Sequence, residues 1–167
     1  DMTLELLAAF GIHIEREGYE LFRIPGGQSY QACQYQVEGD YSGAAFLFAA
    51  ASSAGVASSA GAASYAGEPA LTVHNLKPQS AQGDRAFLDA LKQAGTAFSW
   101  EANALSIWPA ALKPFSFDAT DCPDLFPPLA ALAAACPGTS HLTGVSRLKH
   151  KESNRGLTIQ SEFKKIE

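Results

Sequence analysis

Short strand-like and helix-like stretches follow one another in an order that begins a second time before this chain of 167 residues ends. The first round is expected to contain a strand at 35–38, a helix at 43–51, a strand at 70–75, a helix at 85–94 and strands at 97–100 and 104–108. The second is expected to contain a strand at 115–117, a helix at 125–135, a strand at 139–143 and a helix at 152–165. Helices and strands that alternate in this way pack as layers of helix on sheet, so the repeat predicts a mixed α+β fold.

A stretch rich in Ala, Ser and Gly at residues 50–66 interrupts the first round and leaves two interpretations open. Because small residues pack closely, the stretch could be a tightly packed helix followed by a loop. The same composition is also typical of a flexible segment. Ahead of the repeat, apolar residues with helical spacing predict a helix at 3–10 that Gly11 closes, and strands are expected at 12–15 and 19–24.

The composition argues against several classes of protein. With 12 Lys and Arg against 17 Asp and Glu, the chain has a net charge of −5, which disfavours a general nucleic-acid surface. No apolar run reaches the roughly 18 residues that a membrane span needs, and no signal peptide is expected. Cys33, Cys122 and Cys136 are an odd number of cysteines without metal-ligand spacing. We therefore expect neither a disulfide framework nor a zinc site, but buried small side chains in a reducing compartment.

The densest cluster of charged residues, from Lys149 to Arg155, is the first candidate for a functional site. On a helix, Lys151, Glu152 and Arg155 would fall within one arc, because they are spaced by three and four residues. Two cations beside one carboxylate at a helix N-terminus can hold an anionic substrate and leave the carboxylate to donate or accept a proton. A solvated helix start with ordinary ion pairs explains the same residues.

Two further candidates stand at predicted helix starts. The run Asp121-Cys122-Pro123-Asp124 precedes the helix at 125–135, where an Asp can cap the helix and a fixed carboxylate can also accept substrate hydroxyls. Residues 37–45 place Asp40 and Ser42 where they can cap the helix at 43–51 or face a ligand. Capping is the simpler interpretation in both cases. The sequence shows no metal-ligand spacing, no phosphate-binding loop and no serine-nucleophile motif.

Several of these segments, taken in order, resemble one family closely: 3-phosphoshikimate 1-carboxyvinyltransferase, also called EPSP synthase. The resemblance covers essentially the whole chain. It is carried by Asp1-Met2-Thr3-Leu4, Phe10-Gly11, Gly26-Gly27-Gln28-Ser29-Tyr30, Val37-Glu38-Gly39-Asp40, Ser42, Ala44-Ala45, Gln82-Gly83-Asp84, Pro123-Asp124, Lys151-Glu152-Ser153 and Arg155.

This resemblance implies an alpha–beta prism built from βαβαββ repeat units, of which the chain holds an incomplete set. Residues 1–38 would be the end of the first, shikimate-phosphate-binding half of such an enzyme. Residues 39–167 would be part of the second half, with one unit at about 39–112 and most of another at about 113–167. The chain is therefore expected to be a fragment that is inactive alone, from a full-length enzyme that is a cytoplasmic monomer.

The resemblance also implies the reaction and the residues that perform it. The enolpyruvyl group of phosphoenolpyruvate is transferred to the 5-hydroxyl of 3-phosphoshikimate, and phosphate is released, as a step of aromatic amino-acid (chorismate) biosynthesis. The residues implied as catalytic are Asp124, Lys151 and Glu152, with Asp124 and Lys151 also binding 3-phosphoshikimate and Arg155 binding phosphoenolpyruvate. No metal, organic cofactor, nucleic acid or membrane is implied.

Some positions depart from the family pattern, and two alternative assignments stay open. Arg147 stands where some members place an Asn that contacts the phosphate of shikimate, and we assign it no role from the resemblance. The related UDP-N-acetylglucosamine enolpyruvyl transferase shares the fold and the donor, but its catalytic region lacks the Lys-Glu-Ser-x-Arg pattern. A non-catalytic domain on the same fold is the second alternative, against which Asp124, Lys151, Glu152 and Arg155 all argue.

Overall fold

The computed structural model describes residues 1–54, 67–150 and 154–165. The chain divides into two compact units, Asp1–Glu38 and Gly39–Glu167. The assignment of these units to the two halves of a larger prism stays a prediction. No helix in the described ranges is long and apolar enough to cross a membrane.

The first unit is a helix followed by a two-stranded hairpin. Helix α1 (Met2–Ala9) is followed by Gly11, whose φ of +78° suits a glycine. Strands β1 (Glu15–Glu17) and β2 (Leu21–Arg23) pair antiparallel. No residue of this unit is buried, and large apolar side chains such as Tyr19 and Ile24 are exposed on it.

Two expectations for the first unit need correction. The hairpin strands are shorter than predicted and are shifted along the chain, because the turn comprises residues 18–20 rather than 16–18. In the described structure, residues 35–38 do not form the predicted strand. Alternation of apolar and polar residues reports only a local tendency, whereas a strand also requires a neighbour in register.

The second unit begins with helix α2 and a three-stranded sheet. Helix α2 (Tyr41–Ser53) precedes β3 (Leu71–Val73), η1 (Gly83–Ala86), α3 (Phe87–Ala94), β4 (Ala97–Glu101) and β5 (Ala104–Trp108). The strands are antiparallel in the order β3-β5-β4, with Ser106 of β5 opposite both Thr72 and Ser99. Gly95 ends α3 with a φ of +87°, which confirms the predicted helix end.

A second round of elements follows with a different sheet. It comprises β6 (Ser116–Asp118), η2 (Pro123–Leu125), α4 (Phe126–Ala134), β7 (His141–Thr143), η3 (Val145–His150) and α5 (Arg155–Phe163). Strands β6 and β7 pair in parallel, so the chain leaves both strands at the same edge of this small sheet. The residues that follow each strand, 119–124 and 144–150, are thereby brought together.

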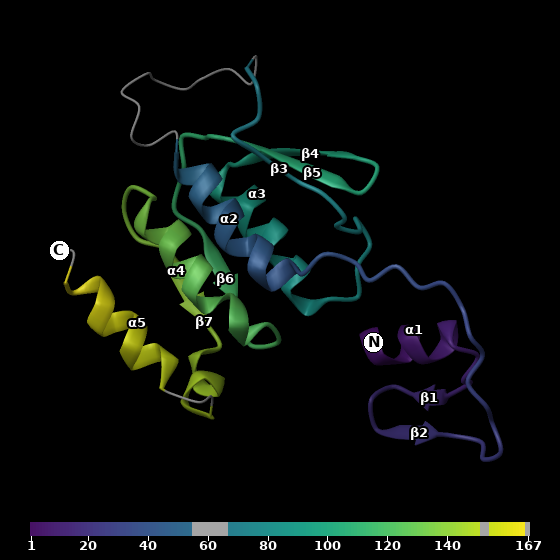
Figure 1. Ribbon diagram of the computed structural model, residues 1–167. Helices are drawn as coiled ribbons and strands as arrows, with labels where there is room; N and C mark the ends of the chain where they lie inside the picture. Colours follow the sequence, from purple (N-terminus) through teal and green to yellow (C-terminus); the bar gives the residue numbers. More distant parts are fainter. Residues whose placement is uncertain (55–66, 151–153, 166–167) are drawn as a thin grey trace. The chain divides into compact units, whose positions relative to one another are not determined.

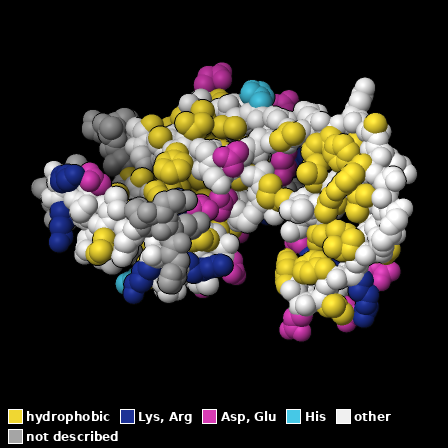
Figure 2. Space-filling model, turned by 60° about the horizontal axis from the view of Figure 1, so that its bottom comes forward, with side chains coloured by type: hydrophobic (Ala, Val, Ile, Leu, Met, Phe, Trp, Pro, Cys, Tyr) yellow, Lys and Arg dark blue, Asp and Glu magenta, His cyan; other side chains and the backbone are white. Residues whose placement is uncertain are grey.

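The core of the second unit lies between α2, α3, α4 and the three-stranded sheet (Figure 1). Helix α2 buries Tyr41, Ala45 and Phe48 on one face, with the helical spacing of three and four residues. Small alanines on α2 permit the close approach of α4, whose Leu129 and Leu132 are fully buried. Apolar side chains also remain on the outside, as Figure 2 shows; Phe46 and Leu47 of α2 are both about half exposed.

The last helix begins later than predicted. Asn154 is the N-cap of α5, and its Oδ1 accepts the backbone N–H of Leu157 at 3.3 Å, so the helix starts at Arg155 rather than at Glu152. Asn is a strong N-cap, which explains this boundary. Ile159 packs against the core. In the Ala-, Ser- and Gly-rich stretch, residues 50–53 continue α2, and residues 55–66 lie outside the described residues.

Candidate functional site

The N-terminal ends of α2, η1 and η2 meet in the second unit, where α2 contacts both short helices. Asp40 caps α2: its carboxylate accepts the backbone N–H groups of Ser42 at 3.1 Å and Gly43 at 2.9 Å. This confirms the capping interpretation of the 37–45 segment. The Ser42 hydroxyl donates a hydrogen bond to the carboxylate of Asp84 in η1, so the two helix starts are joined by side chains.

A single glutamine reinforces this junction. The Nε2 of Gln82 donates to the carbonyl of Gly39 at 2.8 Å, and its Oε1 accepts the backbone N–H of Tyr41 at 2.8 Å. The hydroxyl of Tyr41 donates to the carbonyl of Lys77 at 2.7 Å. The two motifs that begin α2 and η1 therefore form one hydrogen-bonded unit, although 41 and 43 residues separate Gln82 from its two partners.

The turn between β6 and η2 carries Asp124 and is itself held by side chains. The carboxylate of Asp118 accepts the backbone N–H of Thr120 at 3.0 Å and its hydroxyl at 2.6 Å. The hydrogen bonds from Thr120 hold the pKa of Asp118 below its ordinary value, its hydroxyl having the largest effect. From η3, Arg147 donates to the carbonyl of Thr120 at 2.9 Å.

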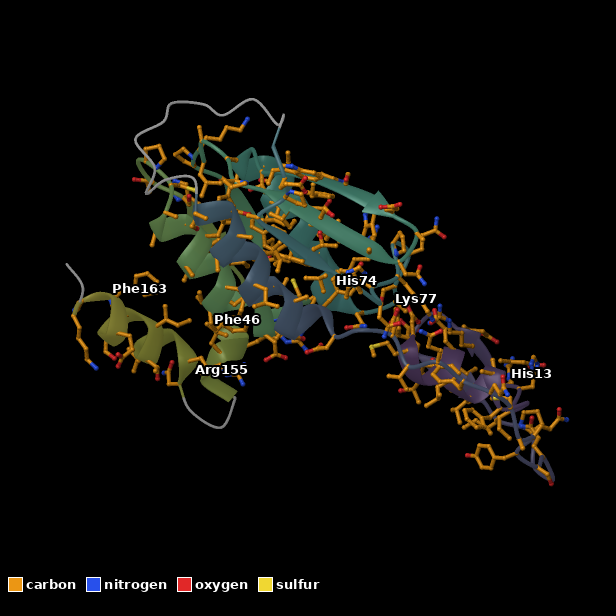
Figure 3. The ribbon with its side chains drawn as sticks, turned by 45° about the horizontal axis from the view of Figure 1, so that its top comes forward. His13, Phe46, His74, Lys77, Arg155 and Phe163 are labelled. Atoms are coloured by element: carbon orange, nitrogen blue, oxygen red, sulfur yellow. The ribbon has the colours of Figure 1, made fainter. Side chains whose placement is uncertain are left out.

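Asp124 and Arg155 meet at the start of α5. The Nη1 of Arg155 donates to Oδ1 of Asp124 at 2.5 Å, across 31 residues of sequence. Figure 3 shows Arg155 at the N-terminal end of this helix. A cation there is disfavoured by the helix dipole, whereas the nearby carboxylate is favoured, so the pair compensates for the position of the arginine. The side chains are 30% and 45% exposed for Arg155 and Asp124, and both groups can therefore be reached by a ligand.

Cys122 belongs to the turn between β6 and η2, and its side chain is buried. Burial raises the pKa of its thiol to about 11, and the negative charges of Asp84, Asp121 and Asp118 add to the effect. The thiol is therefore protonated and inert near neutral pH. Burial also raises the pKa of Cys136.

We predict that alkylation of Cys122 by iodoacetamide is slow at pH 8 and accelerates about tenfold per pH unit up to pH 9.5, because only the thiolate reacts. Peptide mapping by mass spectrometry would measure the rate, with the exposed Cys33 as the fast internal reference. If Cys122 reacted as fast as Cys33 at pH 8, the burial of this thiol would be contradicted.

The structure places the predicted site residues as follows. Asp124 and Arg155 are brought together, whereas Lys151 and Glu152 lie outside the described residues. The helix-capping interpretation of the Asp121–Asp124 run is wrong: among the residues that the structure describes, no side chain caps η2 or α4, and the carboxylate of Asp124 binds Arg155. Cys122 and Cys136 are buried as expected, but Cys33 is exposed, because the first unit buries none of its residues.

The sequence alone indicates no function for Arg147 or Gln82. Both side chains form hydrogen bonds with backbone groups that are distant in sequence, and residue type alone does not reveal such partners. The Gln82-Gly83-Asp84 motif was the one signal in the sequence for Gln82, and no local pattern indicates the contact that Arg147 makes. Within the described residues, no three His, Cys, Asp or Glu side chains form a group that could hold a metal ion.

These features together define a mixed α+β protein in which a carboxylate and a guanidinium meet where helices begin. Such a pair can accept hydroxyl groups and bind an anion. The family model for EPSP synthase (3-phosphoshikimate 1-carboxyvinyltransferase) matches residues 1–167, and the chain belongs to this family.

Relatives and solved structures agree with this assignment. The chain is 39% identical over 163 residues to 3-phosphoshikimate 1-carboxyvinyltransferase of Methanoculleus marisnigri, a match that covers 96% of this chain and 36% of the relative. It is 34% identical over 167 residues to the protein of that name from Clostridium kluyveri. A solved EPSP synthase from Acinetobacter baumannii superposes with a TM-score of 0.74 at 25% identity, over 96% of this chain and 36% of that one. The chain thus spans about a third of the length of the relatives it matches.

Proposed function

We propose that this chain contributes part of the active site of an enzyme that transfers the carboxyvinyl group of phosphoenolpyruvate to the 5-hydroxyl of 3-phosphoshikimate. The observation that carries the proposal is the contact between Asp124 and Arg155 at the start of α5. It joins a hydroxyl acceptor to an anion-binding cation, and this reaction needs both. The full-length enzyme is proposed to act as a cytoplasmic monomer, and this chain alone to be inactive.

The energetics of the pair suit a ligand-binding role. Ion pairs between partly exposed groups contribute about 0–1 kcal/mol to stability. The contact of Asp124 with Arg155 therefore adds little to the stability of the fold, and substrate groups can replace it at small cost. A hydroxyl would then donate to Asp124, and Arg155 would bind a carboxylate or phosphate oxygen through parallel N–H groups.

The proposed chemistry transfers protons and one carboxyvinyl group. Asp124 accepts the proton of the attacking 5-hydroxyl, whose oxygen bonds to the central carbon of phosphoenolpyruvate, and this proton leaves with the released phosphate. Glu152 donates a proton to the methylene carbon and removes one again as the bond to phosphate breaks, which restores the double bond. Lys151 and Arg155 balance the negative charges of the substrates. The roles of Lys151 and Glu152 rest on the resemblance of the Lys-Glu-Ser-x-Arg segment to the family pattern.

The test is an assay of the full-length protein that contains this chain. Incubation with phosphoenolpyruvate and 3-phosphoshikimate should release inorganic phosphate in equal amount to a new carboxyvinyl ether, which mass spectrometry detects. Replacement of 3-phosphoshikimate by UDP-N-acetylglucosamine is the matched control for the acceptor and should give no product. Release of phosphate with the second acceptor alone would contradict the proposal.

The Glu152→Gln variant of the full-length protein should turn over about 10²-fold more slowly, because glutamine cannot exchange a proton with the methylene carbon. Steady-state phosphate release would measure this, and circular dichroism should show an unchanged fold. The neighbouring Ser153→Ala variant is the control, expected within about fivefold of wild type. Near-normal turnover of Glu152→Gln would remove this residue from the mechanism.

A further inference from the structure

The guanidinium of Arg147 is directed at the turn that precedes Asp124. Its Nη1 donates to the carbonyl of Thr120 at 2.9 Å and lies 3.8 Å from Oδ1 of Asp121. The Asp121 side chain is fully exposed, so this ion pair contributes little. A hydrogen bond from a charged donor to a carbonyl is stronger than a neutral one. The bond to Thr120 is therefore the contact through which Arg147 acts.

Other contacts also hold the receiving turn at the point that Arg147 contacts. Asp118 holds both the backbone N–H and the hydroxyl of Thr120. On the other side, Gly144 approaches so closely that a Cβ there would lie 2.4 Å from the Thr120 nitrogen. The backbone of Ala119 adds a bond to the carbonyl of Thr143 at 3.0 Å. A shift of the Thr120 carbonyl would therefore displace the rest of the 118–124 turn, including Asp124.

We propose that Arg147 is a positioning residue that holds the 118–124 turn and thereby fixes Asp124 for the reaction. The inference rests on the proposed function for its effect on turnover. Arg147 binds the turn at Thr120 and Arg155 binds it at Asp124, so two arginines on either side of the Lys151–Ser153 segment bind the same turn. Because Arg147 donates to a protein carbonyl in the turn that carries Asp124, we expect its effect on turnover to pass through Asp124.

The first experiment tests the turn without using activity. Cys122 lies inside the turn and is 6% exposed, whereas Cys136 at the end of α4 is 8% exposed and has no contact with Arg147 in the described structure. In the full-length Arg147→Met variant, iodoacetamide should modify Cys122 about fivefold faster at pH 8.5, with Cys136 unchanged. Arg147→Lys, which keeps a charged donor, should restore most of the protection. Equal acceleration at both cysteines would show general destabilisation and would overturn the inference.

The second experiment separates positioning from substrate binding. Arg147→Met should lower kcat about tenfold and leave the KM for 3-phosphoshikimate within about twofold, because a displaced catalytic group slows the chemical step. In an Asp124→Asn background, the same change should have less than a twofold further effect, since the two residues act on one step. Asp121→Asn, which removes the exposed ion pair, should leave kcat and the KM for 3-phosphoshikimate like those of wild type.

Each outcome bears on one of the two proposals. A full-length wild type without turnover would contradict the proposed function, and the labelling rates of Cys122 would still decide whether Arg147 holds the turn. With an active wild type, a large rise in the KM for 3-phosphoshikimate, or a full tenfold loss in the Asp124→Asn background, would show that Arg147 contacts substrate directly. Either result would overturn the positioning role and leave the proposed function intact.

Discussion

Replacing Asp124 by Asn in the full-length protein should lower kcat by about 10³-fold, the largest kinetic effect we expect from any residue in the described part of the chain. Asparagine has nearly the same shape but cannot accept the proton of a substrate hydroxyl. It also loses the charge that attracts the Arg155 guanidinium, which now lies 2.5 Å from Oδ1 of the carboxylate. The loss of the proton acceptor acts on the chemical step, so both kcat and kcat/KM should fall.

Phosphate release at saturating concentrations of both substrates would measure this effect. Asp121→Asn is the matched control, because it removes a carboxylate three residues earlier in the same turn that is fully exposed and lies 3.8 Å from Arg147. We expect its turnover within about twofold of wild type. The free energy of unfolding should change by about 1 kcal/mol or less in Asp124→Asn. Turnover of Asp124→Asn within tenfold of wild type would contradict the proposed role of this carboxylate.

Replacing Gly144 by Ala should destabilise the second unit by about 3 kcal/mol. The residue has a φ of +93°, which strains any side chain, and an added Cβ would lie 2.4 Å from the backbone nitrogen of Thr120 and 2.8 Å from its Cα. Backbone atoms cannot rotate away as a flexible side chain can. The strain would be relieved only by separating the 118–124 turn from the end of β7, which loosens the turn that carries Asp124.

Two other glycines serve as controls that separate backbone strain from the steric clash of the added Cβ. Gly138 has a φ of +86° with its nearest neighbour at 3.4 Å, so Gly138→Ala should cost about 1 kcal/mol from backbone strain alone. Gly67 has no atom of the described residues within 4 Å of an added Cβ, and Gly67→Ala should change stability by less than about 0.5 kcal/mol. Urea unfolding followed by the fluorescence of Trp100 and Trp108 would measure all three. A loss below 1 kcal/mol for Gly144→Ala would contradict the close approach of the two turns.

The local elements of the second unit were largely predictable from the sequence. The hairpin of β4 and β5 follows from alternation on either side of a reverse turn at 101–103. Gly95 ends α3, and Asp40 caps α2, because both devices use hydrogen bonds between residues only a few positions apart. The family itself was recognisable because several short motifs keep a fixed order along the chain.

Assembly of the candidate site was not predictable in the same way. Asp124 has the residue type and position of a helix cap, yet it binds Arg155, because the parallel pairing of β6 with β7 brings the residues after both strands to one edge. Gln82 contacts partners 41 and 43 residues away for a comparable reason: α2 and η1 pack together. No local pattern encodes such contacts.

The sequence by itself therefore determined the mixed α+β class, the approximate positions of the helices of the second unit and the family. Turns, helix caps and hydrophobic periodicity depend on residues that are close together in sequence. The residue types alone are therefore informative about them. Only the tertiary structure decided that Asp124 pairs with Arg155 and that Arg147 holds Thr120 across 27 residues. Those contacts depend on how the helices and the parallel strands pack, which fixes distances between segments that the local sequence leaves free.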